Sequence, residues 1–423
     1  MSGPSSAMLG HIARPLPRSV LLVVLLTPAA VCAEDADFQV QPDPALLAEI
    51  ESLPDNTWMK LPAFSVTGDL SWLGPRADER RRGPFGRSYC NHAYWAPERK
   101  RALFCGGGHN VRPINDVWEY DLAANVWICL RGADPPFAAT EAWFRENAMI
   151  KDGIAATRTG APVRMHHQWD QVAYDPSRRL LLYVDSMPRS LTYDVKLERK
   201  GNALELGLGM THEALQTELG PDGIYVWGFD AAKRKWTQAE FLVDWKGPGN
   251  TVGGRQESGI LEYIPDTQGL WFGGYGGALR RDPTTNRWTR IDNASRTYGA
   301  VGVYDHDTKT VIAVHNARTL GRTLDEKGWQ TLVEKSPATG NDGNCTLFYD
   351  PVAKKVVMFS AAAQPNLWLY DVAENVWTDP RPQGYPPCDV SAERMIVYYD
   401  LARNVLVYYD SREIWVYRCR RRK

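Results

Sequence analysis

The chain alternates short apolar runs with polar turns, and the same order of runs returns several times. One stretch contains the runs Asn91–Glu98, Ala102–Cys105, Asp116–Asp121 and Asn125–Trp127. Each run is rich in aromatic and β-branched residues and is bounded by Pro, Gly, Asn or Asp, which is typical of a strand between tight turns. The stretch therefore predicts four antiparallel strands.

Similar stretches follow along the chain, and each ends in a tryptophan. These closing tryptophans are Trp127, Trp236, Trp288, Trp329 and Trp377. The last three lie 41 and 48 positions apart, which suits a repeat of four strands. The gap of 109 positions between the first two is about twice as long. We attribute it to insertions near residues 134–164 and 196–222, the second with a short helix near 211–218; a hidden seventh repeat is the alternative.

The final repeat lacks its fourth strand, and a matching piece lies near the N-terminus. The chain ends soon after the third-strand run Ile414–Tyr417. The segment Asn56–Pro62 carries Trp58 where the other fourth strands carry their tryptophan. We predict that this segment pairs with the strand around Trp415 and closes the set of sheets, because closure removes exposed sheet edges.

Two cysteines flank the first predicted hairpin. Cys90 and Cys105 lie at similar distances from the turn at Pro97–Lys100, so we expect them to be close across it, within reach of a disulfide. Seven cysteines are few for 423 residues, so an apolar core has to stabilise the fold.

These repeats resemble the kelch repeat. The resemblance rests on a double glycine after the second strand, clear at Gly106–Gly108 and Gly273–Gly274, on Tyr-Asp in the third strand and on Trp in the fourth. It covers residues 56–419. It implies an all-β, kelch-like β-propeller of the galactose oxidase and kelch superfamily, most simply with six blades of four antiparallel strands. It also implies ligand binding at the mouth of the central channel.

The N-terminus predicts export. Residues 1–33 combine Arg14 and Arg18, the apolar run Ser19–Leu26 and a small-residue site before Glu34, as in a signal peptide. Cys32 leaves a lipoprotein signal as the alternative. We therefore expect a secreted or periplasmic protein, with an N-terminal segment at 34–55, the propeller at 56–419 and a basic tail at 420–423. We expect no membrane span and, at a formal net charge of −1, no nucleic-acid partner.

The candidate site residues lie at strand boundaries that the repeat places at one end of the sheets. Arginine can grip a carboxylate or sulfate with two parallel hydrogen bonds, and His or Tyr can exchange protons with a substrate. We assign catalysis to His109, His166 and Tyr298. We assign substrate binding to Asn110, Arg164, His167, Arg255, Arg296 and His315. Of these, we expect His109, Arg164, His166, Arg255 and Tyr298 to converge in one pocket.

This chemistry suits a small anionic ligand, best an acidic carbohydrate. A polysaccharide lyase that acts by β-elimination would use Arg for the uronate carboxylate and His or Tyr for proton transfer. A non-catalytic protein-interaction propeller is the first alternative. A metal-dependent oxidase of the galactose oxidase type is the second, although the sequence shows no adjacent Tyr-His pair. We assign no metal and no cofactor, and the oligomeric state is open.

Overall fold

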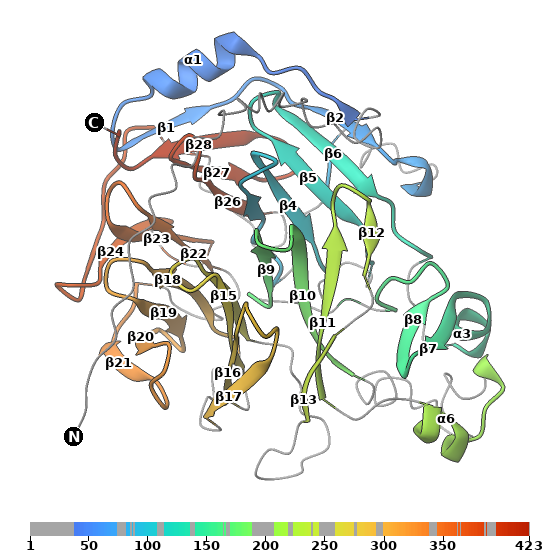
Figure 1. The fold of residues 1–423 in the computed structure, drawn as a ribbon. Coiled ribbons are helices and arrows are strands. Elements are labelled where there is room, and N and C mark those ends of the chain that lie inside the picture. Colours follow the sequence, from blue (N-terminus) through green and yellow to red (C-terminus); the bar gives the residue numbers. More distant parts are fainter. Residues whose placement is uncertain are drawn as a thin grey trace, which may run out of the picture.

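A computed structural model shows six antiparallel sheets of four strands, arranged as the blades of a propeller (Figure 1). The structure describes residues 38–73, 82–84, 87, 89–107, 114–135, 140–163, 165, 170–187, 207–218, 223–237, 240–244, 259–274, 277–292, 299–337, 345–361, 363, 365–384, 386 and 395–422.

Each blade is a meander whose first strand is innermost. Blade 1 has β3 (Tyr94–Ala96), β4 (Arg101–Cys105), β5 (Val117–Asp121) and β6 (Val126–Arg131). Blade 2 has β9 (Val172–Asp175), β10 (Leu180–Met187), β11 (Gly223–Asp230) and β12 (Lys235–Trp236). Blade 3 has β14 (Ile260–Ile264), β15 (Gly269–Gly274), β16 (Gly277–Arg281) and β17 (Trp288–Asp292).

The other three blades repeat this order. Blade 4 has β18 (Val301–Asp305), β19 (Thr310–His315), β20 (Arg318–Thr323) and β21 (Gln330–Val333). Blade 5 has β22 (Cys345–Asp350), β23 (Lys355–Ser360), β24 (Leu367–Asp371) and β25 (Val376–Thr378). Blade 6 has β26 (Ile396–Asp400), β27 (Val405–Tyr409), β28 (Ile414–Arg418) and β1 (Thr57–Lys60).

The innermost strands form a closed ring. β3 contacts β9, and contacts continue through β14, β18 and β22 to β26, which contacts β3 again. The prediction of six blades of four antiparallel strands is confirmed, and the seven-blade alternative is wrong. In its described part, the long gap between Trp127 and Trp236 holds blade 2 and several peripheral elements, and no second blade.

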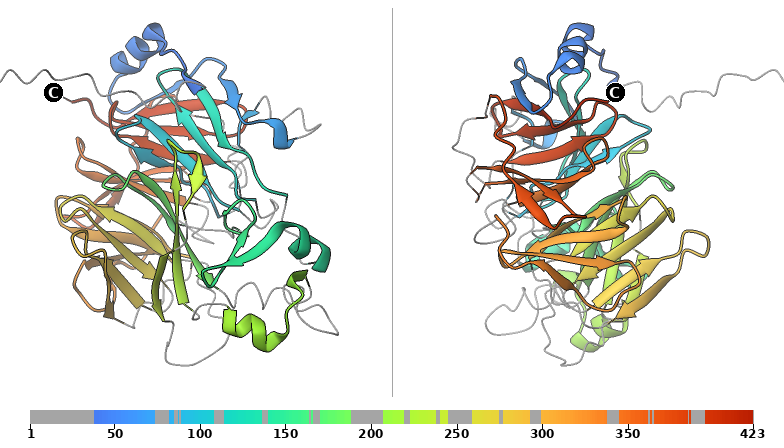
Figure 2. Two further views of the ribbon diagram at one scale, coloured as in Figure 1. Left: turned by 45° about the vertical axis from the view of Figure 1, so that its right-hand side comes forward. Right: turned by 90° about the vertical axis from the view of Figure 1, so that its left-hand side faces the viewer.

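These peripheral elements lie outside the ring beside blades 1 and 2 (Figures 1 and 2). They are α3 (Glu141–Asn147), the hairpin of β7 (Ala148–Lys151) and β8 (Ile154–Thr157), and α6 (His212–Glu218), the short helix that the sequence predicted. In addition, β13 (Glu240–Asp244) pairs with β11 as an extra strand of blade 2.

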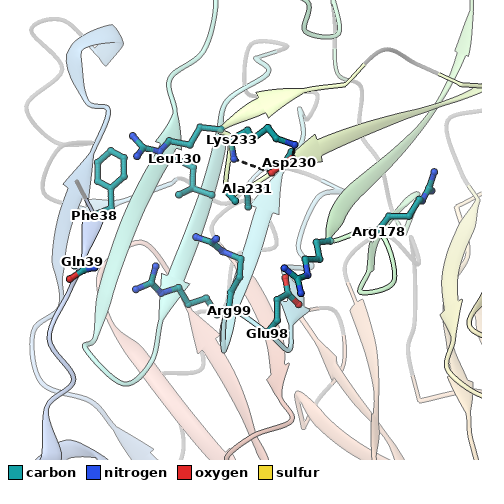
Figure 3. A pocket seen from close by; sticks show the side chains of 13 residues that line it. Phe38, Gln39, Glu98, Arg99, Leu130, Arg178, Asp230, Ala231 and Lys233 are labelled. Atoms are coloured by element: carbon teal, nitrogen blue, oxygen red, sulfur yellow. Dashed lines mark hydrogen bonds and ion pairs between the residues drawn. The ribbon is translucent and has the colours of Figure 1, made fainter. Parts of the chain in front are cut away.

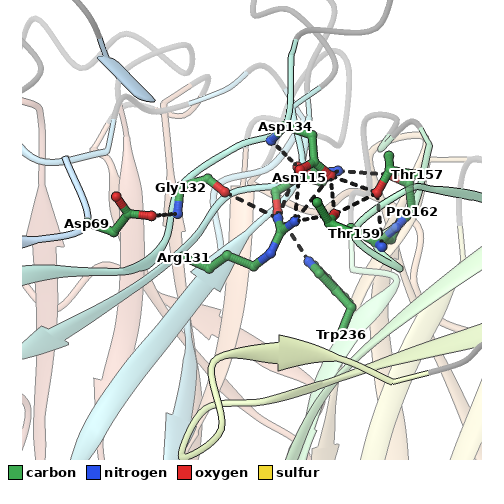
Figure 4. Close-up of polar contacts among 10 residues, drawn as sticks. Asp69, Asn115, Arg131, Gly132, Asp134, Thr157, Thr159, Pro162 and Trp236 are labelled. Carbon is green, nitrogen blue, oxygen red and sulfur yellow. Dashed lines mark hydrogen bonds and ion pairs between the residues drawn. The ribbon is translucent and has the colours of Figure 1, made fainter. Parts of the chain in front are cut away.

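A buried polar cluster fixes the first of these insertions to the propeller (Figure 4). Asp134 accepts hydrogen bonds from Thr157 Oγ1 at 2.7 Å and Asn115 Nδ2 at 2.9 Å, and it pairs with Arg131. Burial alone would raise the pKa of Asp134, but Arg131 and these donors together lower it. Trp236 Nε1 of blade 2 donates to the Asn115 carbonyl oxygen at 3.2 Å, so the cluster also joins two blades.

The predicted closure is confirmed. β1 pairs antiparallel with β28, with Trp58 opposite Tyr417 and Lys60 opposite Trp415. Tyr417 donates its hydroxyl to Asn56 Oδ1 at 2.9 Å, over 361 positions of sequence. The N-terminal strand thus supplies the part of the repeat that the C-terminal stretch lacks.

The same Tyr–Asn hydrogen bond is internal in other blades, and this identifies it as part of the repeat. Tyr120 donates to Asn125 Oδ1 at 2.6 Å, and Tyr370 donates to Asn375 Oδ1 at 2.8 Å. In each case the bond spans the turn between the third and fourth strands.

The segments next to β1 cover the outside of the closing blade (Figure 1). α1 (Pro44–Ser52) begins after Asp43, whose carboxylate caps its first turn, and it buries Leu46 and Ile50. Arg418 Nη2 donates to the Ile50 carbonyl oxygen at 2.8 Å, so the two ends of the chain are joined here. β2 (Ser65–Gly68) then adds a parallel strand outside β6, before a short 3-10 turn at Ser71–Leu73.

The turns between first and second strands share one backbone conformation. The residue before the second strand has φ between 51° and 57° in all six blades, at Lys100, Arg179, Gln268, Lys309, Lys354 and Asn404. In blades 2, 4, 5 and 6 a buried Asp closes the first strand, and its carboxylate accepts backbone N–H groups of the turn, as Asp350 does from Val352 and Ala353. These first-strand aspartates therefore stabilise the turn that follows them, as Asp commonly does.

We predicted that Cys90 and Cys105 face each other across the first hairpin, but the register differs from this by two residues. Tyr94 lies opposite Leu103, and this register places Cys90 across from Gly107, whose carbonyl oxygen lies 2.6 Å from Cys90 Sγ. Cys105 is a buried free thiol, so the expected disulfide is absent.

Candidate functional site

The innermost strands all begin at one end of the ring, which we call the mouth end. The turns after the first and third strands of each blade lie at the other end, the turn end. Of the predicted site residues, His109, Asn110, Arg164, His166, His167, Arg255, Arg296 and Tyr298 lie outside the described residues. His315 ends β19, with Nε2 2.8 Å from Asn316 Nδ2. The predicted convergence therefore stays a prediction.

The described floor of the mouth is built around an Asp–His pair that the sequence analysis did not select. His92 lies just before β3, and Asp170 lies just before β9. His92 Nδ1 and Asp170 Oδ1 are 2.9 Å apart, and the side chains are 13% and 3% exposed. Asp170 Oδ2 also accepts the backbone N–H of Gly302 in β18 at 2.7 Å. One carboxylate of blade 2 thus contacts blades 1 and 4.

Aromatic side chains hold the imidazole of His92 in place. Its ring stacks on Tyr94 at 4.2 Å between centroids, and Phe348 of blade 5 approaches it edge-on at 4.6 Å. With Asp170 on Nδ1, the ring is fixed in both tilt and rotation. No hydrogen bond to Nε2 comes from the residues that the structure describes.

A carboxyl group with a perturbed pKa lies near this pair. Burial, and then the charge of Asp170, raises the pKa of Glu262 in β14 well above its usual value of 4.5. Burial, followed by the charge of Asp170, likewise raises the pKa of Tyr94. The floor therefore combines an aspartate, an imidazole that this aspartate orients, and a carboxyl group whose pKa is raised, an arrangement found where proton transfer is needed.

The nearby Arg87 has a structural role. Its Nη2 donates to both carboxylate oxygens of Asp116, at 2.8 and 2.6 Å, and its side chain is only 2% exposed. Trp118 Nε1 donates to the same carboxylate at 2.7 Å. This arginine joins the strands of blade 1 and is not available to a ligand.

The sequence did carry a signal for the floor. The residues that begin or precede the inner strands are mostly apolar, as Ile396 and Val397 are in blade 6. His92 and Asp170 are polar or charged just before their strands, and Glu262 is charged at the third position of β14. The signal was missed because each exception lies in a different repeat, and only the ring brings them together.

Two further observations limit the chemistry of the described residues. Within the described ranges, no three or more His, Cys, Asp or Glu side chains are grouped so that they could hold a metal ion. In the same part of the chain, no helix is long and apolar enough to cross a membrane.

Comparisons with known proteins give the fold alone. No protein-family model and no curated protein sequence matches the chain. Among solved structures, it is similar to a chain of the nidogen/laminin complex, with 10% identity over 68% of this chain and 78% of that one, at a TM-score of 0.37. It is similar to a chain of the mitotic checkpoint complex, with 11% identity over 95% and 99% and a TM-score of 0.41.

A third similarity is to the extracellular domain of a hybrid two-component system from B. thetaiotaomicron. The identity is 10%, the coverage is 79% of this chain and 42% of that one, and the TM-score is 0.39. Likeness at this level carries no argument about function, which has to come from the residues of this chain.

Proposed function

We propose that the protein binds an acidic carbohydrate at the mouth of the propeller channel and cleaves it by β-elimination. The observation that carries the proposal is the His92–Asp170 pair at the floor of the mouth, at 2.9 Å. The predicted arginines Arg164, Arg255 and Arg296 would supply the cationic wall for the carboxylates. Export, as predicted from residues 1–33, would bring the protein to polysaccharides outside the cytoplasm.

In this proposal His92 is the base. Asp170 keeps the proton on Nδ1, so Nε2 has the lone pair needed to remove the proton beside the uronate carboxylate. The C–O bond to the leaving sugar then breaks, a C=C bond forms, and the leaving oxygen takes a proton. Glu262, whose pKa is raised by burial and by the charge of Asp170, is the group assigned to supply it.

The test compares wild type with His92→Gln on polygalacturonate, alginate and neutral dextran. Glutamine keeps a donor for Asp170 but cannot act as a base, so we expect binding to persist while product formation falls at least about 100-fold. The matched control is His306→Gln, which changes a histidine at the turn end of blade 4. Product is followed by the ultraviolet absorbance of the unsaturated uronate, and binding by calorimetry.

Each outcome decides one part of the proposal. Wild type that binds neither acidic polymer contradicts the ligand class and favours the protein-interaction alternative. Binding without product leaves a lectin-like role and removes the lyase step. Equal loss in His92→Gln and His306→Gln removes the assignment of the floor. Loss of binding in Arg255→Ala or His109→Ala would support the predicted wall.

A further inference from the structure

A cationic groove lies at the turn end, between blades 1 and 2 (Figure 3). Its volume is about 800 Å³. Three turns and the start of the described chain form it: the β3–β4 turn, the β9–β10 turn, the β11–β12 turn and Phe38–Gln39. The groove is thus at the opposite end of the propeller from the proposed site, and it does not depend on that site.

The charges that line the groove are mostly positive. Six cationic side chains face two acidic ones, Glu98 and Asp230. The cationic side chains are Arg99, Arg101, Arg178, Arg179, Lys233 and Arg234.

Buried acids behind the wall hold several of these cations in fixed positions. The side chain of Glu119, which is 0% exposed, accepts hydrogen bonds from Arg99 Nε at 2.9 Å and Arg101 Nη1 at 2.6 Å. Asp175, 1% exposed, accepts from Arg178 Nε at 2.8 Å. These acids offset the charge of the arginines, but they lie on the protein side of the guanidinium groups. A fixed guanidinium loses less conformational entropy when it binds an oxyanion.

Donor capacity remains on this wall. The described residues supply no partner to Arg178 Nη2, which is buried, and none to Arg101 Nη2. Arg179 is exposed and forms no ion pair or hydrogen bond within the described ranges. At the rim, the guanidinium of Arg234 lies 4.2 Å from the ring centroid of Phe38, which anchors the start of the described chain against the groove.

We propose that this groove is a second binding site, which takes a sulfated or carboxylated oligosaccharide. The cations come from separate turns, so a ligand has to present several oxyanions spaced along its length. A chain of sugar rings carries such groups on a stiff frame. An acidic peptide would have to order one flexible side chain for each contact, at a cost in conformational entropy that the rings largely avoid.

The experiment measures binding of a heparin-type sulfated hexasaccharide to the full chain, with Arg179→Gln as the main variant. The control is Lys309→Gln, because Lys309 holds the same turn position in blade 4, with the same φ of 57°. We expect about tenfold weaker binding for Arg179→Gln, as one charge-assisted contact is lost, and no change for the control.

A second pair of variants tests the anchored cations. Arg178 lines the groove, and Arg178→Gln removes its ion pairs with Asp175 and Glu240. Arg403→Gln removes the ion pair with Asp400 at the corresponding position of blade 6, away from the groove. We expect Arg178→Gln to bind more weakly than Arg403→Gln at similar stability, and affinity to fall with added salt. Because Arg179 lies at the turn end, weaker binding by Arg179→Gln separates this groove from the mouth.

Three results would overturn the proposal. Equal binding by Arg179→Gln and Lys309→Gln would place the probe elsewhere. Equal binding of the desulfated hexasaccharide would show that the cations are not used. Tighter binding of hexaglutamate, with the same dependence on Arg179, would assign the groove to an acidic peptide instead.

Discussion

The six blades are more alike at the turn end of the propeller than at the mouth end. At the turn end, all six blades place a residue of positive φ before the second strand, so the blades share one backbone conformation there. At the mouth end the blades differ, and His92, Asp170 and Glu262 are contributed by three different ones. The comparison shows that the repeat preserves the sheets, whereas departures from it supply the chemistry of the floor.

The largest expected effect comes from deleting the N-terminal segment that contains β1, the strand that completes blade 6. Deleting residues 34–62 removes β1 and five buried apolar side chains: Leu46, Ile50, Leu53, Trp58 and Leu61. At about 1.5–3 kcal/mol each, this loss matches the whole net stability of a typical domain, about 5–15 kcal/mol. We expect no soluble protein, measured by expression and thermal melting. A chain that begins at residue 38 is the control, and an unchanged melting temperature in the deletion would contradict the closure.

Next in size is the contrast between two buried aspartates, one at each end. In Asp170→Asn the amide would donate to His92 Nδ1 and leave the proton on Nε2, so turnover of an acidic polysaccharide should fall at least about 100-fold. Asp350→Asn, at the turn end of blade 5, should lower stability without changing turnover per folded molecule, because Asp350 binds the turn and the Tyr399 hydroxyl, away from the mouth. Steady-state rates and urea unfolding distinguish the two, and an active Asp170→Asn would break the contrast.

A smaller effect concerns pH at the mouth end. Because the pKa of Glu262 is raised in the folded state, folding favours its protonated form. Its contribution to stability is therefore complete below the unfolded pKa, near 4.5, and is lost as pH rises toward the folded pKa, by up to about 1.4 kcal/mol per pH unit. Glu262→Gln should lack this loss, whereas Glu374→Gln on an exposed turn should retain it. Urea unfolding between about pH 4 and pH 8 measures the difference, and parallel curves for wild type and Glu262→Gln would refute it.

The smallest expected effect compares one hydrogen bond in the closing blade with the same hydrogen bond in blade 5, which is formed by one continuous stretch of sequence. Tyr417→Phe removes the hydrogen bond to Asn56, and Tyr370→Phe removes its counterpart to Asn375 inside blade 5. We expect both to lower the free energy of unfolding by about 1 kcal/mol, because the same bond is lost. A much larger loss for Tyr417→Phe would show that the closing blade differs energetically from the others.

The propeller fold could be predicted because the residues that indicate it lie close together in the sequence. Tyr120, Asn125 and Trp127 lie within eight residues of one another, and the same group recurs in blade 5 as Tyr370, Asn375 and Trp377. The register at Cys90 was wrong because Cys90 and Cys105 lie 7 and 5 residues from the turn at Pro97–Lys100, whereas residues that face each other across this hairpin lie at equal distances from the turn.

The floor could not be predicted, because its contacts are distant in sequence. His92 and Asp170 are 78 positions apart, and Asp170 and Gly302 are 132 apart. No single repeat contains two of these residues. The groove likewise forms only where three turns from two blades meet. In the sequence its arginines therefore cannot be distinguished from other arginines in turns.

The pairing of β1 with β28 has a consequence for synthesis. Asn56 leaves the ribosome long before Tyr417, its partner 361 positions later. At about 5–20 residues per second the delay is roughly 20 to 70 seconds, during which the N-terminal strand has no partner. The ring can close only after translation of the last blade ends. Nascent chains therefore spend this interval with an open sheet edge, when a chaperone or a translocation machinery can hold them.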